Sequence, residues 1–346
     1  MYLTEKEIMS THEALEKSFE QVLSQRSEIE AFFEANKQRK LVFIGCGSSL
    51  MLAKGCEKLF GARAGCSAVA IAGGDYVVAP DFYEEYLKDA IVVALSRSGE
   101  TTEILKAISL MNDRFNIKLV SITMNDESKL AKQSDLGLFM PWAYDKSVCQ
   151  TRSITNIYAA SLLLYAIIFG NEELIADVKK AVSANEKFMA DNRAALEKIG
   201  NIDFSNVVVL ADGPLCGMAD EGALAFTEIA LVPGQFHNML DYRHGPIVLN
   251  DKNTLTIAVL QTVDNDYQQD LVKDVKAHGG TVVTIGEGAD AVPDIDLHIA
   301  VGEVGNFTVI GIYFIYVCQM IAFARAVKCG IDPDKPIGLN LFVTLK

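Results

Sequence analysis

Short apolar runs alternate with amphipathic helical stretches along most of the chain. In the first half, the runs that read as buried strands lie at 41–45, 68–72, 90–95, 118–123 and 136–140. In the second half they lie at 207–211, 256–260, 281–285 and 297–301. Strands that alternate with helices indicate parallel sheets covered on both faces, so the pattern predicts an α/β fold.

The pattern also divides the chain. Residues 172–199 are charged and helical without a strand signal, and the strand–helix alternation starts again after them. We therefore predict two doubly wound parallel-sheet domains in tandem, related as a structural repeat. The first domain spans 1–171, the helical connector 172–199, and the second domain 200–346 with its C-terminal tail. A capping box from Thr4 to Glu7 predicts one long N-terminal helix over about 5–36.

Composition narrows the class of partner. The formal net charge is −14, which argues against a nucleic acid and against an anionic membrane surface. The seven cysteines are scattered without zinc-site spacing, so we expect no metal and a reducing, cytoplasmic location. The N-terminus has no apolar signal core. Residues 307–324 carry no charge, but their length and polar interruptions favour a buried core helix over a membrane span.

The segment Ser-Arg-Ser-Gly-Glu-Thr at 96–101 lies where an apolar strand gives way to a helix. A helix N-terminus with short hydroxyl side chains is a ready site for a phosphate group, although an ordinary capped turn has the same residue types. Ser48 and Ser49 follow another strand and join this loop at the carboxyl edge of the sheet. Leu50 replaces the third glycine of a dinucleotide fingerprint and no Walker-type loop occurs, so we expect no nucleotide or redox cofactor.

Two carboxylates and a histidine form a second group. Glu221 and Glu228 lie seven residues apart, which places both on one face of a helix. The residues between them are largely apolar, and a buried carboxyl group has a raised pKa that suits proton transfer. His244 precedes a Gly-Pro turn on an expected loop. The alternative is a solvated helix face and a simple turn.

Together, these motifs resemble the tandem sugar-isomerase (SIS) domain family, typified by the isomerase half of glucosamine-6-phosphate synthase. Galactosamine-6-phosphate deaminase/isomerases and fructosamine-6-phosphate deglycases are similar. The matching pieces occur in the family's order over nearly the whole chain: Cys-Gly-Ser-Ser at 46–49, Ser-Arg-Ser-Gly-Glu-Thr at 96–101, Ser-Val-Cys-Gln-Thr at 147–151, Glu-Gly-Ala-Leu at 221–224, Glu228, Arg-His-Gly-Pro at 243–246 and Asp-Pro-Asp-Lys-Pro at 332–336.

The resemblance implies an enzyme that shifts a proton between C1 and C2 of an amino-sugar or ketose/aldose 6-phosphate, without metal or redox cofactor. Glu228 would move the proton, Glu221 would support it, and His244 would open the sugar ring, supplied by the partner subunit of a homodimer with a shared active site. The implied phosphate-binding residues are Ser48, Ser49, Ser96, Arg97, Ser98, Thr101, Val148 and Gln150.

This chain departs from the synthase at three positions. Ala225 and Leu341 stand where the synthase isomerase has lysines, and Arg97 where it has glutamine. No glutaminase domain precedes residue 1, so we expect no synthesis of glucosamine 6-phosphate from glutamine. Arg97 favours the deaminase/isomerase branch. A fructosamine-6-phosphate deglycase and a non-catalytic sugar-phosphate sensor remain alternatives.

Overall fold

The computed structural model describes residues 1–346 except 38, 262–264, 289–293 and 345–346. Among the described residues, ten strands form two parallel five-stranded sheets. The first sheet has the order β2-β1-β3-β4-β5. Its strands are β1 (Lys40–Gly45), β2 (Ala68–Ala72), β3 (Ala90–Ser96), β4 (Lys118–Thr123) and β5 (Leu136–Phe139), close to the predicted runs.

The second sheet has the order β10-β9-β8-β6-β7. Counted along the chain, both sheets therefore have one topology, with the second strand at an edge beside the first. The strands are β6 (Asn206–Leu210), β7 (Gly234–His237), β8 (Thr254–Val259), β9 (Thr281–Glu287) and β10 (Leu297–Val301). The sequence analysis missed β7, because this four-residue edge strand is only partly buried and lacks an apolar run.

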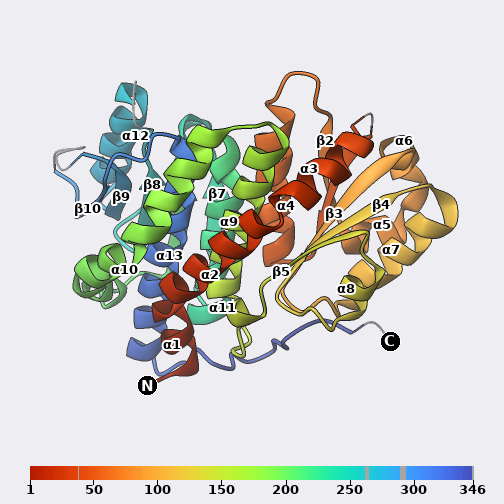
Figure 1. The fold of residues 1–346 in the computed structure, drawn as a ribbon. Coiled ribbons are helices and arrows are strands. Elements are labelled where there is room, and N and C mark those ends of the chain that lie inside the picture. The colour runs from red at the N-terminus through yellow and green to blue at the C-terminus, as the bar shows by residue number, and fades with distance from the viewer. Residues whose placement is uncertain (38, 262–264, 289–293, 345–346) are drawn as a thin grey trace.

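Helices cover both sheets and fill the space between them (Figure 1). The longer helices after β1 are α4 (Ser48–Gly61), α7 (Thr102–Arg114), α9 (Arg152–Ile168), α10 (Glu172–Gly200), α11 (Cys216–Ala230), α12 (Asp266–Ala277) and α13 (Ile310–Lys328). The shorter ones are α5 (Gly73–Val78), η1 (Pro80–Tyr83), α6 (Glu84–Leu87), α8 (Lys129–Gln133), η2 (Pro141–Ala143), η3 (Gly213–Leu215), η4 (Leu240–Arg243), η5 (Pro246–Leu249) and η6 (Phe307–Val309).

The N-terminal segment corrects one prediction. Three successive helices replace the single expected helix: α1 (Leu3–Met9), α2 (Thr11–Ser24) and α3 (Arg26–Ala35). The capping box is also wrong, because Thr4 lies inside α1 and its hydroxyl donates to the Pro333 carbonyl at 2.8 Å. The cap comes instead from far along the chain. The Asp334 carboxylate accepts the backbone amides of Leu3 and Thr4 at 2.9 and 2.7 Å.

The principal hydrophobic cluster continues across both halves of the molecule. It includes Phe43 and Val93 of the first sheet, Val207 and Ile257 of the second, and most of α13. The segment Phe307–Lys328 is long and apolar enough to cross a membrane, but 94% of its most apolar window is buried inside the fold. The expected core helix is therefore observed, and it lies between the two sheets.

Candidate active site

The site forms at the carboxyl ends of β1 and β3, where the strand order reverses. The connections from these neighbouring strands lead to α4 and α7, and ligands of open α/β sheets bind in the crevice at such a switch point. A cavity of about 30 Å³ lies there. Its lining includes six of the predicted phosphate-binding residues: Ser49, Ser96, Arg97, Ser98, Thr101 and Gln150.

The loop between β3 and α7 has a conformation that suits an anion. Gly99 has a φ of +63°, and a Cβ atom there would lie 2.1 Å from the Ser128 hydroxyl, so the turn requires glycine. The hydroxyl oxygens of Ser96 and Ser98 accept the amides of Gly99 and Glu100 at 3.0 and 3.2 Å. Each hydroxyl hydrogen remains able to donate to a ligand. The positive end of the α7 dipole adds to this preference for negative charge.

Arg97 is 5% exposed and bridges three segments of the chain. Its guanidinium donates to the carbonyls of Ser147 and Val148 at 3.1 and 3.0 Å, and to the Leu341 carbonyl. The Val148 amide in turn donates to the Asp334 carbonyl at 3.2 Å. Both groups are therefore engaged with other parts of the protein, and their predicted contact with phosphate stays a prediction.

Helix α11 brings the two glutamates to the site from the second half. Gly217 allows the close approach, since a Cβ atom there would lie 2.4 Å from the Met51 carbonyl oxygen of α4. One turn further along α11, Glu221 is 2% exposed and accepts the hydroxyl of Ser48 at the start of α4. Oε2 of Glu221 has no hydrogen-bond partner among the described residues. The two halves thus contribute to one site.

Both glutamates have raised pKa values. Burial raises the pKa of Glu221 well above its usual value and the charge of Glu228 adds to this, while Ser48 and Arg97 act in the opposite direction. Burial also raises the pKa of Glu228, against the Arg97 charge and a hydrogen bond from the Cys149 thiol. Carboxyl groups in such surroundings can accept and return a proton near neutral pH.

The structure does not bring His244 to this cavity within one chain. His244 is exposed between η4 and η5, and its amide donates to the Asp241 carbonyl at 2.9 Å. Its neighbour Arg243 pairs with Asp274 of α12 at 2.6 Å. A contact between His244 and this cavity would therefore require a second subunit.

The C-terminal tail covers the cavity. Leu341 belongs to the lining, and the Val343 carbonyl accepts the amide and hydroxyl of Thr102 at 3.3 and 3.2 Å. Figure 1 shows this tail crossing the molecule from the region of α1 toward α8. A volume of about 30 Å³ holds about one water molecule. A larger ligand therefore requires the tail or the lining side chains to move.

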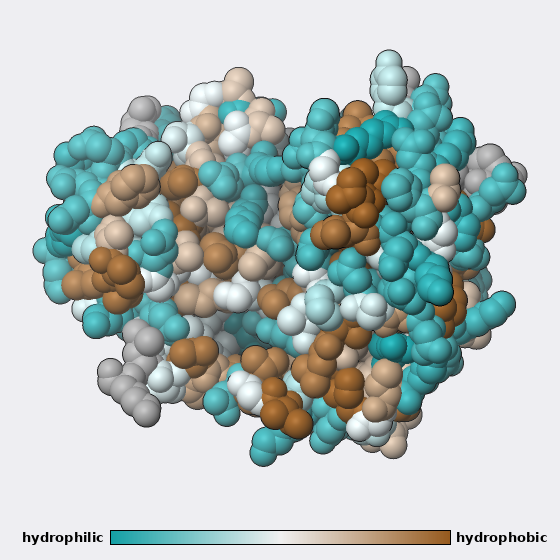
Figure 2. Space-filling view, turned by 180° about the vertical axis from the view of Figure 1, so that it is seen from behind, coloured by the Kyte–Doolittle hydropathy of each residue, from teal (hydrophilic) through white to brown (hydrophobic). Residues whose placement is uncertain are grey.

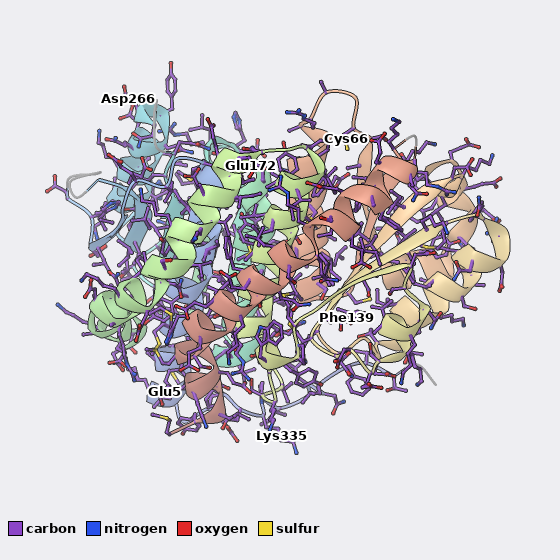
Figure 3. The ribbon with its side chains drawn as sticks, viewed as in Figure 1. Glu5, Cys66, Phe139, Glu172, Asp266 and Lys335 are labelled. Carbon is purple, nitrogen blue, oxygen red and sulfur yellow. The ribbon has the colours of Figure 1, made fainter. Side chains whose placement is uncertain are left out.

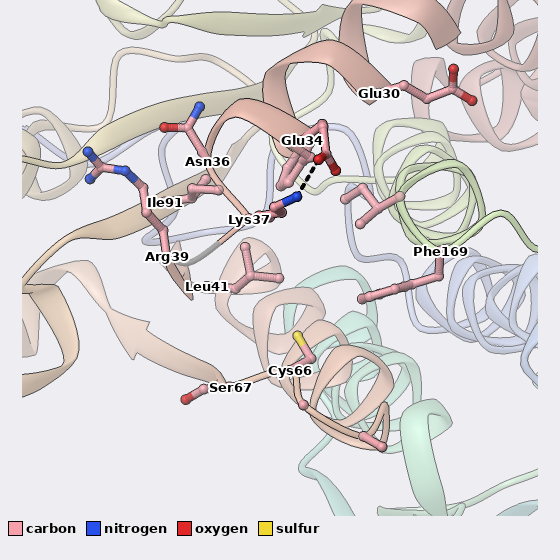
Figure 4. Close-up of a pocket in the computed structure, with 14 residues that line it drawn as sticks. Glu30, Glu34, Asn36, Lys37, Arg39, Leu41, Cys66, Ser67, Ile91 and Phe169 are labelled. Atoms are coloured by element: carbon pink, nitrogen blue, oxygen red, sulfur yellow. Dashed lines mark hydrogen bonds and ion pairs between the residues drawn. The ribbon is translucent and has the colours of Figure 1, made fainter.

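A larger cavity of about 420 Å³ lies at the other end of the first sheet, lined by Leu41 and Ile91 near the starts of β1 and β3 (Figure 4). Its walls include Phe33 and Phe169, and its charged side chains already have ion-pair partners, as in the Lys37–Glu34 pair at 2.5 Å. The hydroxyl loop lines the smaller cavity and is absent from the lining of this one, while Glu221 and Glu228 are lining residues of neither cavity. We therefore assign the chemistry to the smaller cavity.

Fold and site together define an α/β protein with a hydroxyl-rich loop at the switch point of a parallel sheet and two carboxyl groups of raised pKa, one buried and one partly buried. The SIS domain model matches residues 35–168, which contain the first sheet and its loop. Residues 35–168 of the chain thus match an SIS domain.

Relatives of this chain include sugar-phosphate enzymes. It is 26% identical, over 99% of its length and 56% of the relative, to a glutamine–fructose-6-phosphate aminotransferase (isomerizing) of Sulfurisphaera tokodaii. It is 29% identical to a D-galactosamine-6-phosphate deaminase of Shewanella sp., over 77% of this chain and 69% of the relative. The chain spans about half the length of the aminotransferases that it matches.

Solved structures with the same fold include two with similar sequences. A candidate tagatose-6-phosphate ketose/aldose isomerase of Clostridium novyi superposes with a TM-score of 0.90 at 26% identity, covering 99% of this chain and 94% of that one. A glucosamine-6-phosphate deaminase of Thermotoga maritima gives 0.75 at 27% identity, over 95% of this chain and 100% of that one. The chain is thus similar to enzymes of the phosphosugar isomerase and deaminase kind.

Proposed function

We propose that the protein is a phosphosugar isomerase or deaminase that shifts a proton between C1 and C2 of an amino-sugar or ketose/aldose 6-phosphate. The observation that carries this proposal is the glutamate pair on α11, with Glu221 buried and Glu228 partly buried. Both have raised pKa values, and the charge of Arg97 in the hydroxyl loop acts on both. An anion site fixes one end of the substrate, and a proton acceptor stands ready for the other.

In this mechanism the loop hydroxyls and the α7 N-terminus hold the 6-phosphate. The Glu228 carboxylate takes a proton from one of the two carbons and returns it to the other through an enediol or enolamine. With an amino sugar, the proton leaves C2 and arrives at C1, and water then hydrolyses the resulting C2 imine to a ketone and ammonia. Arg97 and Glu221 set the charge around Glu228.

We further propose that the second sheet belongs to a second SIS domain, with boundaries 1–171, 172–199 and 200–346. The identical strand order of the two sheets supports this proposal. The names of the relatives support an amino-sugar or ketose 6-phosphate as substrate class.

His244 is proposed to open the sugar ring in the site of a partner subunit. Its loop is exposed and carries Leu240, Val248 and Leu249, which are 41%, 75% and 67% exposed. Figure 2 shows that apolar areas interrupt the polar surface elsewhere too, so assembly needs its own test. Mixing Glu228→Gln chains with His244→Ala chains should restore activity in hybrid dimers. Verified hybrids that stay inactive would contradict a site shared between subunits.

The proposed reaction is tested by isotope exchange. In heavy water, the protein should incorporate deuterium at C1 or C2 of a substrate from a panel of hexose and hexosamine 6-phosphates. Assays of ammonia and amine release on the same panel separate isomerase, deaminase and deglycase. A protein that binds one of these compounds tightly, yet exchanges deuterium into none, would be a sugar-phosphate sensor.

A further inference from the structure

The loop that follows η2 is held from outside by a carboxylate of the N-terminal helix. Glu7 of α1 is 2% exposed, and its carboxylate accepts three hydrogen bonds from two consecutive residues. The amides of Lys146 and Ser147 donate to it at 2.6 and 3.2 Å, and the Ser147 hydroxyl donates at 2.5 Å. The two partners lie about 140 positions further along the chain, so this contact joins distant segments.

The segment fixed by Glu7 leads directly into the proposed site. The carbonyls of Ser147 and Val148 both accept Nη1 of Arg97, and Gln150 lines the cavity. Arg97 in turn belongs to the loop that is proposed to hold phosphate, and its charge acts on Glu221 and Glu228. A continuous chain of contacts thus runs from Glu7 through Ser147 to Arg97.

Helix α1 is itself anchored, so Glu7 has a fixed support. The Asp334 carboxylate caps the first turn of α1, and the Asp334 carbonyl accepts the Val148 amide of the same loop. Figure 3 shows Glu5 and Lys335 at the same end of the molecule, where the N-terminal helix and the C-terminal segment lie together. Both chain ends therefore brace one side of the loop.

The far side of the loop has a separate anchor. Asp145 is fully buried and accepts the amide and hydroxyl of Thr151 at 2.8 and 2.9 Å, as well as the amide of Ser153 at 3.1 Å. Asp145 therefore secures the end of the loop that enters α9. Glu7 secures the end that faces Arg97. Burial and the charge of Asp145 raise the pKa of Glu7, while the hydrogen bonds from Ser147 and Lys146 lower it. Asp145 is itself paired with Arg152 at 3.7 Å.

We propose that Glu7 is a positioning residue for the proposed phosphosugar site: it holds the carbonyls of Ser147 and Val148 where they orient Arg97. This inference rests on the proposed function. It assigns to α1 a role in ligand binding, in addition to its contribution to the stability of the fold.

The first test needs no ligand. Hydrogen–deuterium exchange should show the amides of residues 146–148 exchanging at least about 10-fold faster in Glu7→Gln than in the parent protein, since glutamine offers a single acceptor oxygen. Glu5→Gln is the matched control. It lies two residues away in α1, but its carboxylate pairs with Arg193 of α10 at 2.5 Å. Glu5→Gln should leave the loop protected. Parent-like protection in Glu7→Gln, or equal loss in both variants, would overturn the proposal.

The second test measures binding of inorganic phosphate and fructose 6-phosphate. Glu7→Gln should weaken the binding of both compounds by about 10-fold, with Glu5→Gln within about twofold of the parent. With a turned-over substrate, the loss should appear in KM with kcat retained.

Ser147→Ala removes one donor and leaves α1 intact, so it should weaken binding in the same direction even if Glu7→Gln folds poorly. A folded Glu7→Gln or Ser147→Ala protein with unchanged affinity would overturn the proposal. A parent protein that binds neither compound would refute the proposed function, and the exchange test would still decide how Glu7 acts on the loop.

Discussion

The two sheets have one strand order, yet their carboxyl edges differ in how their polar groups are satisfied. At the first edge, the hydroxyls of Ser96 and Ser98 accept loop amides and keep their hydrogens free to donate. At the second edge, Asp212 follows β6 and supplies an anion from the protein itself. Its carboxylate accepts the Met239 amide at 3.1 Å, the Asn238 side-chain amide at 3.3 Å and the Gln268 side-chain amide at 3.0 Å.

The difference shows how two sheets of the same topology can provide one ligand site rather than two. The second edge binds its own carboxylate, so its donors have no need of a bound anion. The second half instead contributes α11, whose Glu221 and Glu228 pack toward α4 and the first edge. On this interpretation, the carboxyl groups that α11 brings to the first edge serve the reaction, and the carboxylate of Asp212 serves stability.

The largest expected effect separates Glu228 from Asp212 by activity. Glu228→Gln keeps the shape of the side chain but removes the proposed base, so deuterium exchange should fall by about 10²–10⁴-fold. Asp212→Asn should change exchange per folded molecule by less than about threefold, because it lies at the other sheet edge. Exchange followed by mass spectrometry gives both values.

Binding of a hexose 6-phosphate provides the control, because Glu228→Gln should retain it. If the two variants lose exchange equally, the edges do not differ in function. Full exchange in Glu228→Gln would remove Glu228 from the mechanism.

The next effect concerns the anion site itself. Ser98→Ala and Thr101→Ala each remove a hydrogen bond to a charged group, so each should weaken hexose 6-phosphate binding by about 1.5–3 kcal/mol. Gln268→Ala at the second edge should leave this affinity unchanged. Calorimetric titration compares the three variants. An unchanged affinity in the Ser98/Thr101 double variant would show that phosphate does not bind this loop.

The sequence predicted most of the first edge because its signals are local. Buried runs mark the strands on either side of the switch point, and the hydroxyl loop is one short segment between a strand and a helix. The spacing of Glu221 and Glu228 needs only helical geometry, and both residues do lie on α11. The helix begins at Cys216, where η3 leads directly into it.

The rest depends on contacts between distant segments, for which a single sequence has no local pattern. Glu7 was interpreted as part of a capping box, yet its partners are Lys146 and Ser147. The true cap of α1 is Asp334, over 300 positions away. The hydrogen bond from Cys149 to Glu228 likewise joins a loop of the first half to α11, which only the tertiary fold brings together. A polar residue at a position where the sequence pattern predicts burial indicates that a hydrogen-bond partner exists. It does not indicate which residue that partner is.

The smallest expected effect is a difference in the sign of a stability change. Burial raises the pKa of Glu221 in the folded protein, so Glu221 lowers stability at neutral pH, where the unfolded chain carries this side chain ionised. Glu221→Gln keeps an acceptor for Ser48 and should therefore raise the free energy of unfolding at pH 7 by about 1 kcal/mol. This gain should shrink as the pH falls and disappear below the ordinary glutamate value of about 4.3, where Glu221 is protonated in both folded and unfolded states.

Asp212→Asn should instead lower the free energy of unfolding at pH 7. Gln268 is buried, its Oε1 accepts the Gln261 amide at 2.7 Å, and its Nε2 donates to Asp212. An asparagine amide turned toward Gln268 would set two donors against each other, and flipping Gln268 would break its bond to Gln261. The loss should be about 1–3 kcal/mol at pH 7. Urea unfolding of both variants from pH 4 to pH 8 measures the two signs. Destabilisation of both variants at pH 7 would mean that the hydrogen-bonding needs of Glu221 are met as fully as those of Asp212. The proposed difference between the two sheet edges would then be wrong.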